Sequence, residues 1–256
     1  MKSFIITEQN VSTFAAKIAA WIREQVEQAQ GGGVVLGMSG GIDCSVVARL
    51  CRMGEVDVHL ILMPCGDDMK NTKSMDHAIQ FIEKFNFPFH IFDIKPAVDA
   101  LMIHSDTIRR PTNHGNLELS RVNLRPRVRM ICLYQFAQLN NRLVIGTGNL
   151  AERTVGYFTK WGDGGCDLNP LAMITKQEVR ILARYLDVPA CIIDKKPSAG
   201  LWEGQTDEDE LGMTYQQLDD YIISGTSGNK ETDQKIEEKI AKAAHKLAPI
   251  PIFFNL

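Results

Sequence analysis

The sequence predicts an α/β fold in which helices cover both faces of a parallel sheet, giving three layers. Short apolar runs bounded by glycine or polar residues alternate with segments whose apolar residues recur every three or four positions. The chain has 256 residues, of which 45% are hydrophobic and 23% are charged, as in an ordinary globular protein. No repeat, low-complexity segment or linker divides it, so we expect a single domain over residues 1–256.

The first half of the chain predicts three helices that alternate with three strands. Val11, Phe14 and Ile18 recur at helical spacing, and the glycines at 31–33 end that helix. Each strand is a run of Val, Leu and Ile, which is typical of a strand buried on both faces. In chain order we expect a helix over residues 11–29, a strand over 34–36, a helix over 46–53, a strand over 56–63, a helix over 75–85 and a strand over 89–94.

The second half predicts one more strand and four helices. Val128 and Ile131 belong to a long helix, which we expect to begin near Pro126 because proline is tolerated in the first turn of a helix. Three stretches without any period are expected to be loops, and long irregular segments of compact domains are usually functional or disordered. The long helix is expected to end at residue 139, and the other three helices cover 179–186, 215–223 and 232–247. The strand covers 142–145, and the loops cover 106–119, 156–170 and 199–212.

Composition and charge exclude several classes of protein. The chain has 28 basic and 31 acidic residues, whereas a dedicated nucleic-acid binder carries a strong positive excess. No run of about 18 apolar residues is present and the first apolar stretch is too short for a signal peptide, so we expect neither a membrane span nor a leader. The six cysteines form no CxxC pair and no zinc spacing, which indicates free thiols in a reducing compartment. We therefore expect a cytoplasmic protein that binds neither nucleic acid nor membrane.

The segment GMSGGIDCS, from Gly37 to Ser45, connects a predicted strand to a predicted helix. Glycines let the backbone turn tightly and bring N–H groups close to a phosphate, and the helix N-terminus adds its positive end. The loop is not a Walker A motif, because the Gly-Lys-Ser/Thr ending is missing. Asp43 stands where that motif has its lysine, and an aspartate beside phosphate needs a bridging cation, which predicts Mg²⁺. The alternative is a glycine-rich turn with Asp43 as an ordinary first-turn helix residue.

Ser39-Gly40-Gly41-Ile42-Asp43 resembles the pyrophosphatase-type loop of enzymes that cleave ATP to AMP and pyrophosphate. Several further motifs, in the right order, resemble those of the NAD synthetase family within that superfamily. The resemblance covers nearly the whole chain and implies a three-layer Rossmann-like fold of the adenine nucleotide alpha hydrolase-like type. Cys44 departs from the serine usual in the family. The matching segments are NLRPRVRM at 123–130, GTGNLAE at 146–152, GYFTKWGDGGCD at 156–167, NPL at 169–171, KPSA at 196–199, LWEGQTDE at 201–208 and the pair His245-Lys246.

The resemblance implies a ligase that forms NAD from deamido-NAD, ammonia and ATP in the last step of NAD biosynthesis. A carboxylate is a poor electrophile, so it would first attack the α-phosphate of ATP to give an acyl adenylate and pyrophosphate, and ammonia would then displace AMP. Glutamine-dependent members carry an additional glutaminase domain of roughly 250 residues. This chain has no room for one, so we expect it to use free ammonia. The resemblance also implies a homodimer, with the helix at 11–29 and the long helix from Arg127 at the interface, unless both helices only cover the sheet.

The resemblance also assigns roles to individual residues. Asp43 and Glu152 are expected to bind Mg²⁺, which prefers hard oxygen ligands. Asp43 and Lys176 are expected to be catalytic, and Asp163 to support the metal or the ammonia site. The expected ATP-binding residues are Gly37, Met38, Ser39, Gly40, Gly41, Ile42, Asp43, Cys44, Thr147, Lys176 and Ser198, and the expected deamido-NAD-binding residues are Arg127, Lys160, Asp167, His245 and Lys246.

Three of these roles have a purely structural alternative. Glu152 could be an ordinary first-turn carboxylate of a helix, Lys176 a solvated lysine at a helix start, and His245 a surface histidine. Residues 66–73 and 199–212 are expected to close as lids that keep water from the adenylate. The acidic run in the second of these segments is also compatible with a solvated face.

Three competing functions can be weighed on the sequence. Gly146-Thr147-Gly148-Asn149-Leu150-Ala151 fits the GxGxxA fingerprint of dinucleotide-binding oxidoreductases, but that motif needs a helix directly after it. The absence of helical period over 153–170 argues against this function. Another AMP-releasing amidase or a tRNA thiolase could carry the same phosphate loop. A thiolase would usually show paired cysteines and a basic face, and neither is present. A non-enzymatic ATP-binding module would leave Glu152, Lys176 and the segment 156–167 unexplained.

Overall fold

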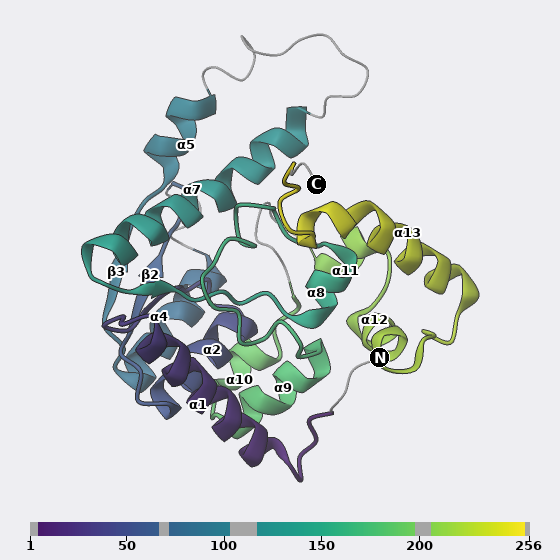
Figure 1. Cartoon of the computed structure of the whole chain (residues 1–256), viewed down its shortest axis with the longest axis horizontal. Helices are drawn as coiled ribbons and strands as arrows, with labels where there is room; N and C mark the ends of the chain where they lie inside the picture. The colour runs from purple at the N-terminus through teal and green to yellow at the C-terminus, as the bar shows by residue number, and fades with distance from the viewer. Residues whose placement is uncertain (1–4, 67–71, 103–116, 198–205, 254–256) are drawn as a thin grey trace.

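A computed structural model describes residues 5–66, 72–102, 117–197 and 206–253 (Figure 1). At its centre lies a parallel sheet of four strands in the order β3-β2-β1-β4. Val34 of the central strand pairs with Val58 on one side and with Leu143 on the other. An isolated bridge between Ile145 and Leu168 continues the sheet beyond its last strand. The strands are β1 (Val34–Gly37), β2 (Val58–Leu62), β3 (Phe89–Ile91) and β4 (Leu143–Val144).

The strand order reverses at β1. The chain first moves outward from β1 through β2 to β3, and it then returns to add β4 on the opposite side of β1. In open α/β sheets of this kind, ligands bind outside the carboxyl ends of the strands, where the order reverses. Gly37 ends β1 and Gly146 follows the bridge residue Ile145, so both glycine-containing loops leave the sheet at this point.

Helices cover both faces of the sheet (Figure 1). Val34 and Leu36 belong to the larger buried cluster, whereas Val35 points to the opposite face and packs with the helices there. Alternate residues of β1 thus face different layers, as expected of a strand buried on both sides. The larger cluster is formed with α1 (Val11–Gln28), α2 (Ile42–Met53), α4 (Lys73–Phe85), α9 (Lys176–Tyr185) and α10 (Ala190–Ile193), and the opposite face is covered by α5 (Lys95–Met102) and α7 (Leu117–Leu139).

A third buried cluster lies beside the sheet and contains Tyr215, Leu218 and Ile236. The helices that form it gather on one side of the molecule, on the right in Figure 1. One of them, α12, packs against both α8 and α9 and so connects this cluster to the sheet layers. The helices are α8 (Leu150–Val155), α11 (Asp207–Leu211), α12 (Tyr215–Ser224) and α13 (Lys230–Leu247).

The three-layer α/β fold and the parallel sheet are confirmed, and every expected strand and helix is present with shifted ends. The lengths of β2, β3 and β4 were overestimated, since only the residues that pair along the sheet count as strand, whereas β1 extends one residue further than expected, to Gly37. Across the described part of the chain, no helix combines the length and the apolar character that crossing a membrane requires.

The expected start of the long helix near Pro126 is wrong. The helix α7 begins at Leu117, so Pro126 lies inside it and residues 117–119 of the expected loop 106–119 are helical; the rest of that expected loop lies outside the described residues. Proline leaves one carbonyl of the preceding turn without its helical hydrogen bond. The loop that follows α8 packs on this turn: the Thr159 hydroxyl donates to the Asn123 side chain at 2.7 Å, and Gly162 lies against the Pro126 ring. Tertiary packing therefore outweighs the local preference of the proline.

The expectation that no helix follows Gly146-Thr147-Gly148 is also wrong, because α8 begins at Leu150. This helix has six residues and is too short to show an apolar period; α11, within the expected loop 199–212, was missed for the same reason. In α8, the Asn149 side chain accepts from the Glu152 N–H, and the Glu152 carboxylate accepts from the Asn149 N–H. A carboxylate therefore occupies the helix start where a dinucleotide fold would bind pyrophosphate, and this observation now argues against the oxidoreductase.

The phosphate-loop candidate gives a first test of the fold. Gly40 has a φ of +71°, and a Cβ atom there would lie 2.0 Å from the Ser74 carbonyl oxygen at the start of α4. We expect Gly40→Ala to lower the free energy of unfolding by about 3 kcal/mol, because left-handed strain and a backbone clash add together. Gly212 has the same φ with nothing within 4 Å of a Cβ, so we expect Gly212→Ala to cost only about 1 kcal/mol. Urea denaturation measures both, and equal losses would contradict the contact of this loop with α4.

Candidate active site

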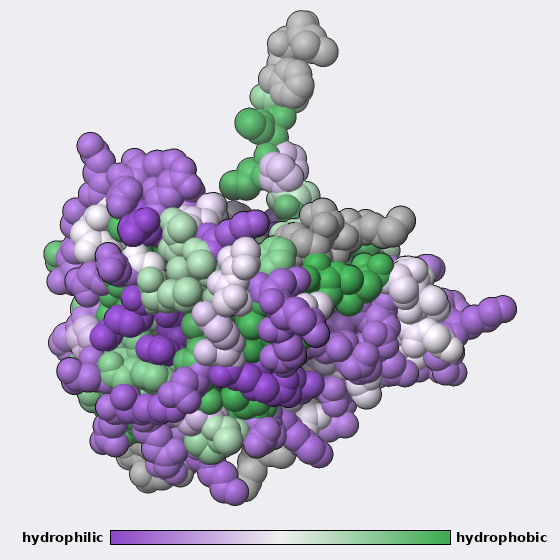
Figure 2. Space-filling model, turned by 90° about the horizontal axis from the view of Figure 1, so that it is seen from below, coloured by the Kyte–Doolittle hydropathy of each residue, from purple (hydrophilic) through white to green (hydrophobic). Residues whose placement is uncertain are grey.

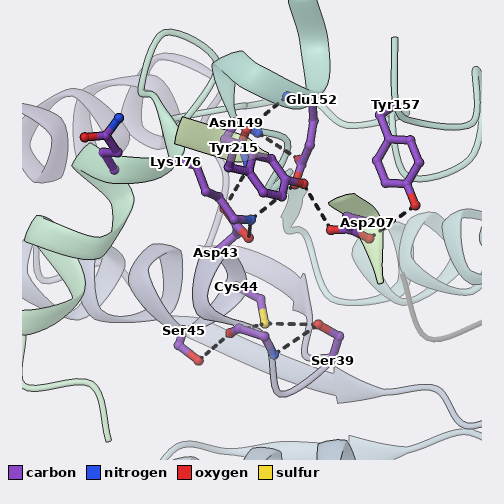
Figure 3. A network of polar contacts seen from close by, with 12 residues as sticks. Ser39, Asp43, Cys44, Ser45, Asn149, Glu152, Tyr157, Lys176, Asp207 and Tyr215 are labelled. Carbon is purple, nitrogen blue, oxygen red and sulfur yellow. Dashed lines mark hydrogen bonds and ion pairs between the residues drawn. The ribbon is translucent and has the colours of Figure 1, made fainter. Parts of the chain in front are cut away.

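The phosphate-loop candidate is shaped by its own hydroxyl and thiol groups (Figure 3). The Ser39 hydroxyl accepts a hydrogen bond from the Gly41 N–H at 3.3 Å and lies 3.4 Å from the Cys44 sulfur. The buried Cys44 thiol and the Ser45 hydroxyl both donate to the Gly41 carbonyl, at 3.2 and 2.8 Å. Gly41 is the N-terminal cap of α2, and no side chain caps this helix in the described part of the chain. The first N–H groups of α2 are therefore available to an anion.

Three side chains from different helices meet above this loop. The Lys176 Nζ lies 2.7 Å from the Asp43 Oδ2 and 3.4 Å from the Glu152 Oε1. The Lys176 side chain is 2% exposed, and each carboxylate side chain is 18% exposed. Asn149 joins the group by donating from Nδ2 to the Asp43 Oδ1 at 3.0 Å. The structure thus places Asp43, Glu152 and Lys176 together, and it excludes the interpretation of Lys176 as a solvated lysine.

The electrostatics of this cluster follow from its burial. Burial alone lowers the pKa of the Lys176 ammonium, but the neighbouring Asp43 and Glu152 charges outweigh burial and hold that pKa above its ordinary value. Burial raises the pKa of Glu152; Lys176 opposes this change and the Asp43 charge adds to it. Lys176 therefore remains a cation, and Glu152 is the carboxylate whose charge the surroundings disfavour.

The backbone at the start of α9 holds Lys176 in place. Thr175 and Glu178 form a capping box, in which the Glu178 carboxylate accepts from the Thr175 N–H at 2.8 Å. Asp219, on α12, accepts from the N–H groups of Lys176 and Gln177 at 3.3 and 2.8 Å. Burial raises the pKa of Asp219 to about 6, although these N–H groups act in the opposite direction. Three carboxyl or hydroxyl groups thus fix the turn from which the Lys176 side chain starts.

A small cavity of about 50 Å³ opens beside Glu152. The Asp163 carboxylate on its wall accepts from the Thr159 N–H at 2.9 Å. The protein packed around this carboxyl group raises its pKa, and the Thr159 N–H opposes the increase. Asn169 adds a buried Oδ1 atom that has no hydrogen-bond partner among the described residues. The residues that line the cavity are Thr147, Gly148, Glu152, Arg153, Phe158, Asp163, Gly164 and Asn169.

Comparison with known proteins assigns this chain to a family. The family model for NAD synthase matches residues 14–249. The chain belongs to the NAD synthase family. The NH(3)-dependent NAD(+) synthetase of Carboxydothermus hydrogenoformans is 40% identical over 90% of this chain and 92% of the relative. The enzyme of the same name from Archaeoglobus fulgidus is 37% identical over 95% of this chain and 97% of the relative.

Solved structures of two family relatives have the same fold. NMN synthetase from Francisella tularensis is 35% identical, with a TM-score of 0.87 over 97% of this chain and 100% of that one. NH3-dependent NAD synthetase from Campylobacter jejuni is 29% identical, with a TM-score of 0.76 over 98% of this chain and 100% of that one. The Rossmann-like NAD synthase fold inferred from the sequence is therefore confirmed.

Three of the residues that were expected to bind deamido-NAD lie together. The Lys160 ammonium donates to the His245 carbonyl at 2.7 Å, which joins the loop after α8 to the end of α13. The Lys246 ammonium donates to the Gly156 and Phe158 carbonyls of the same loop, at 2.6 and 2.7 Å. Lys160, His245 and Lys246 thus form one group at the end of α13, in which His245 is exposed and the two lysines are half-buried.

The other expected substrate residues have different surroundings. Arg127 is exposed on α7. The Asp167 carboxylate accepts from the Tyr134 hydroxyl at 2.9 Å and from the Val144 N–H at 2.8 Å, and so attaches α7 to β4. Thr147 lines the cavity beside Glu152. Ser198 lies outside the described residues, as do residues 67–71 of the expected lid 66–73 and residues 199–205 of the expected lid 199–212.

The sequence interpretation gave no role to five residues of the site. Asn149 appeared only inside a motif, and its capping pattern with Glu152 could have been recognised from the spacing. The Thr175–Glu178 capping box was readable in the same way. Asp219 and Tyr215 gave no local signal, because each reaches the site from α12 by a contact with a residue about 40 positions earlier in the chain.

The buried Lys176 cluster predicts a strong effect on stability. We expect Lys176→Met to lower the free energy of unfolding by about 3 kcal/mol or more, because it leaves two buried carboxylates without their cation. Lys84→Met is the matched control, since Lys84 lies 2.9 Å from Asp187 at the surface and should change the melting temperature very little. Thermal denaturation at neutral pH measures both variants. An unchanged melting temperature for Lys176→Met would contradict the buried cluster.

Proposed function

We propose that this chain is a ligase that converts the nicotinate carboxylate of deamido-NAD into the amide, using ammonia and ATP and releasing AMP and pyrophosphate. The observation that carries this proposal is the buried Lys176 ammonium, set between Asp43 and Glu152 above the uncapped start of α2. A fixed cation and free N–H groups at one point favour the pyrophosphate end of ATP. Membership of the NAD synthase family and the names of the relatives support the same reaction.

The reaction needs activation of the carboxylate before ammonia can attack. A carboxylate oxygen displaces pyrophosphate from the α-phosphorus of ATP, and the resulting acyl adenylate has AMP as its leaving group. Ser39 and the N–H groups at the start of α2 would hold the departing pyrophosphate, and Lys176 would neutralise the charge that grows on it. Most of the catalytic effect then comes from holding two anionic substrates in a reactive geometry.

The donor set of the same cluster fits Mg²⁺. When Asp43 and Glu152 are both ionised, the single Lys176 ammonium leaves one negative charge uncompensated. Mg²⁺ prefers hard oxygen ligands and keeps much of its shell for water and phosphate. Asp43 and Glu152 would hold the ion, which when bound supplies neutralisation of the ATP phosphates.

The cavity beside Glu152 has the size and chemistry of an ammonia site. Its volume of about 50 Å³ accommodates one or two molecules of the size of water. The buried Asn169 Oδ1 would accept an N–H from the bound nitrogen, and the Asp163 carboxylate is placed to take the proton that ammonium must lose before it attacks. The names of the NH(3)-dependent relatives support free ammonia as the nitrogen source.

For deamido-NAD, we propose contacts from Lys160, His245 and Lys246 at the end of α13 and from Arg127 and Asp167 on the α7 side. A second acceptor follows from the comparisons, because NMN synthetase of Francisella tularensis has the same fold at 35% identity. An enzyme that makes this mononucleotide amide needs the corresponding acid mononucleotide, which carries the same nicotinate carboxylate without the AMP half. The proposed chemistry is identical for the two acceptors.

We also propose that the chain forms a homodimer. On α7, Ile131 and Leu139 are 56% and 77% exposed, and Ile91 on the edge strand β3 is 50% exposed. After α13, Ile252 and Phe253 are more than 80% exposed, and Figure 2 shows an apolar arm that stands away from a largely hydrophilic surface near the end of the chain. Exposed apolar surface of this extent is typical of an interface. The α7 part of the interface expected from the sequence is thus favoured over a helix that only covers the sheet.

We propose a cytoplasmic location because the cysteines are free thiols. All six are free thiols, and two of them, Cys44 and Cys51, are buried. Free thiols persist in a reducing compartment.

A product assay tests the proposed function. The purified protein is mixed with Mg²⁺–ATP, ammonium and either deamido-NAD or nicotinate mononucleotide, with parallel reactions that lack each component. We expect amide, AMP and pyrophosphate in equal amounts with ammonium, none after removal of Mg²⁺ with EDTA, and none with glutamine in place of ammonium.

The outcomes of this assay separate the candidates. The ratio of kcat/KM for the two acceptors shows whether the dinucleotide or the mononucleotide is the substrate. Formation of ADP, or of amide without pyrophosphate, contradicts the proposal. ATP binding without any amide product leaves only a nucleotide-binding module.

A further inference from the structure

Asp207, on α11, accepts hydrogen bonds from two tyrosines (Figure 3). The residue is 5% exposed, and its carboxylate oxygens accept from the Tyr215 hydroxyl at 3.0 Å and from the Tyr157 hydroxyl at 3.2 Å. The Tyr157 hydroxyl also donates to Glu210 at 2.7 Å. The three residues come from α11, from the start of α12 and from the loop after α8, so this group connects three segments beside the Lys176 cluster.

Tyr215 connects Asp207 to Lys176. Its side chain is 1% exposed, and the Lys176 Nζ lies 4.9 Å from the centroid of its ring. The ammonium is therefore bounded by the Asp43 carboxylate, the Glu152 carboxylate and the face of this ring. A ring in this place stabilises the cation and occupies the space into which a flexible lysine would otherwise move. The hydroxyl bond to Asp207 in turn fixes the ring.

We propose that Tyr215, fastened by Asp207, is a positioning residue that holds the Lys176 ammonium against the phosphate loop. The inference rests on the proposed function, in which Lys176 neutralises the departing pyrophosphate. Burial and the surrounding carboxylates raise the pKa of the Tyr215 hydroxyl, so it stays protonated and donates to Asp207. Asp207 also contacts the segment just before Ser198, because its backbone N–H donates to the Pro197 carbonyl at 3.0 Å.

The side chains offer a graded set of variants. Tyr215→Leu removes both the ring and the hydroxyl, whereas Tyr215→Phe keeps the ring and loses only the bond to Asp207. Tyr157→Phe is the matched control, since it removes a hydroxyl from the same carboxylate without touching Lys176. We expect kcat/KM for ATP to fall about 20-fold in Tyr215→Leu and about 5-fold in Tyr215→Phe, and to change less than about twofold in Tyr157→Phe. KM for ammonium should stay the same in all three.

The same substitutions in a Lys176→Met background separate positioning from a general structural role. Calorimetric titration with Mg²⁺–ATP gives the Kd for each variant whether or not it turns over. If Tyr215 acts through Lys176, the loss of ATP affinity on Tyr215→Leu should disappear once Lys176 is absent. A merely structural role predicts the same fold-loss in both backgrounds and would overturn the proposal.

Two further outcomes have a defined meaning. If Tyr215→Leu does not fold by circular dichroism, Tyr215→Phe and Tyr157→Phe carry the comparison, and equal effects of these two variants would refute the positioning role. If the wild-type chain binds Mg²⁺–ATP but forms no amide with either acceptor, the proposed function fails. The ATP affinities then still decide whether Tyr215 positions Lys176.

Discussion

The site depends on one buried cation. Taking an ammonium out of water costs several kcal/mol, which close carboxylates can offset. Lys176 has Asp43 and Glu152 as these partners and a tyrosine ring on a further side. Because the partners lie at the starts of α2 and α8 and the lysine at the start of α9, the ion cluster fixes three helix N-termini around one point. The same charges that stabilise this arrangement make the point suitable for Mg²⁺ and polyphosphate.

The topology explains why these helix starts meet. β1 and β4 are neighbours in the sheet although they are far apart in the chain, so the loops that leave their carboxyl ends lie side by side. α2 has no side-chain cap, whereas α8 and α9 are closed by capping boxes. Of these three helices, α2 alone therefore offers its first N–H groups to a ligand. This contrast supports our proposal that the loop from Ser39 to Asp43 binds the phosphates.

Much of this could be predicted from the sequence, because it rests on local patterns. Apolar runs and helical periods identify the layers, and the Ser39–Asp43 loop leads to the cluster of Asp43, Glu152 and Lys176, where we propose that the phosphates bind. Three features could not be predicted. The start of α7 depends on packing around Pro126, α8 is too short to show a period, and Asp219 and Tyr215 act through contacts between distant segments. Long-range contacts of single polar side chains leave no periodic signal along the chain.

The most direct test of the account follows the carboxylate oxygen. If the Lys176 cluster holds the pyrophosphate end of ATP, the substrate carboxylate attacks the α-phosphorus and transfers one of its oxygens to AMP. With the carboxylate of the acceptor labelled with ¹⁸O, mass spectrometry should find one labelled oxygen in AMP for each amide formed and none in pyrophosphate. Label in pyrophosphate or inorganic phosphate, or unlabelled AMP, would contradict the account.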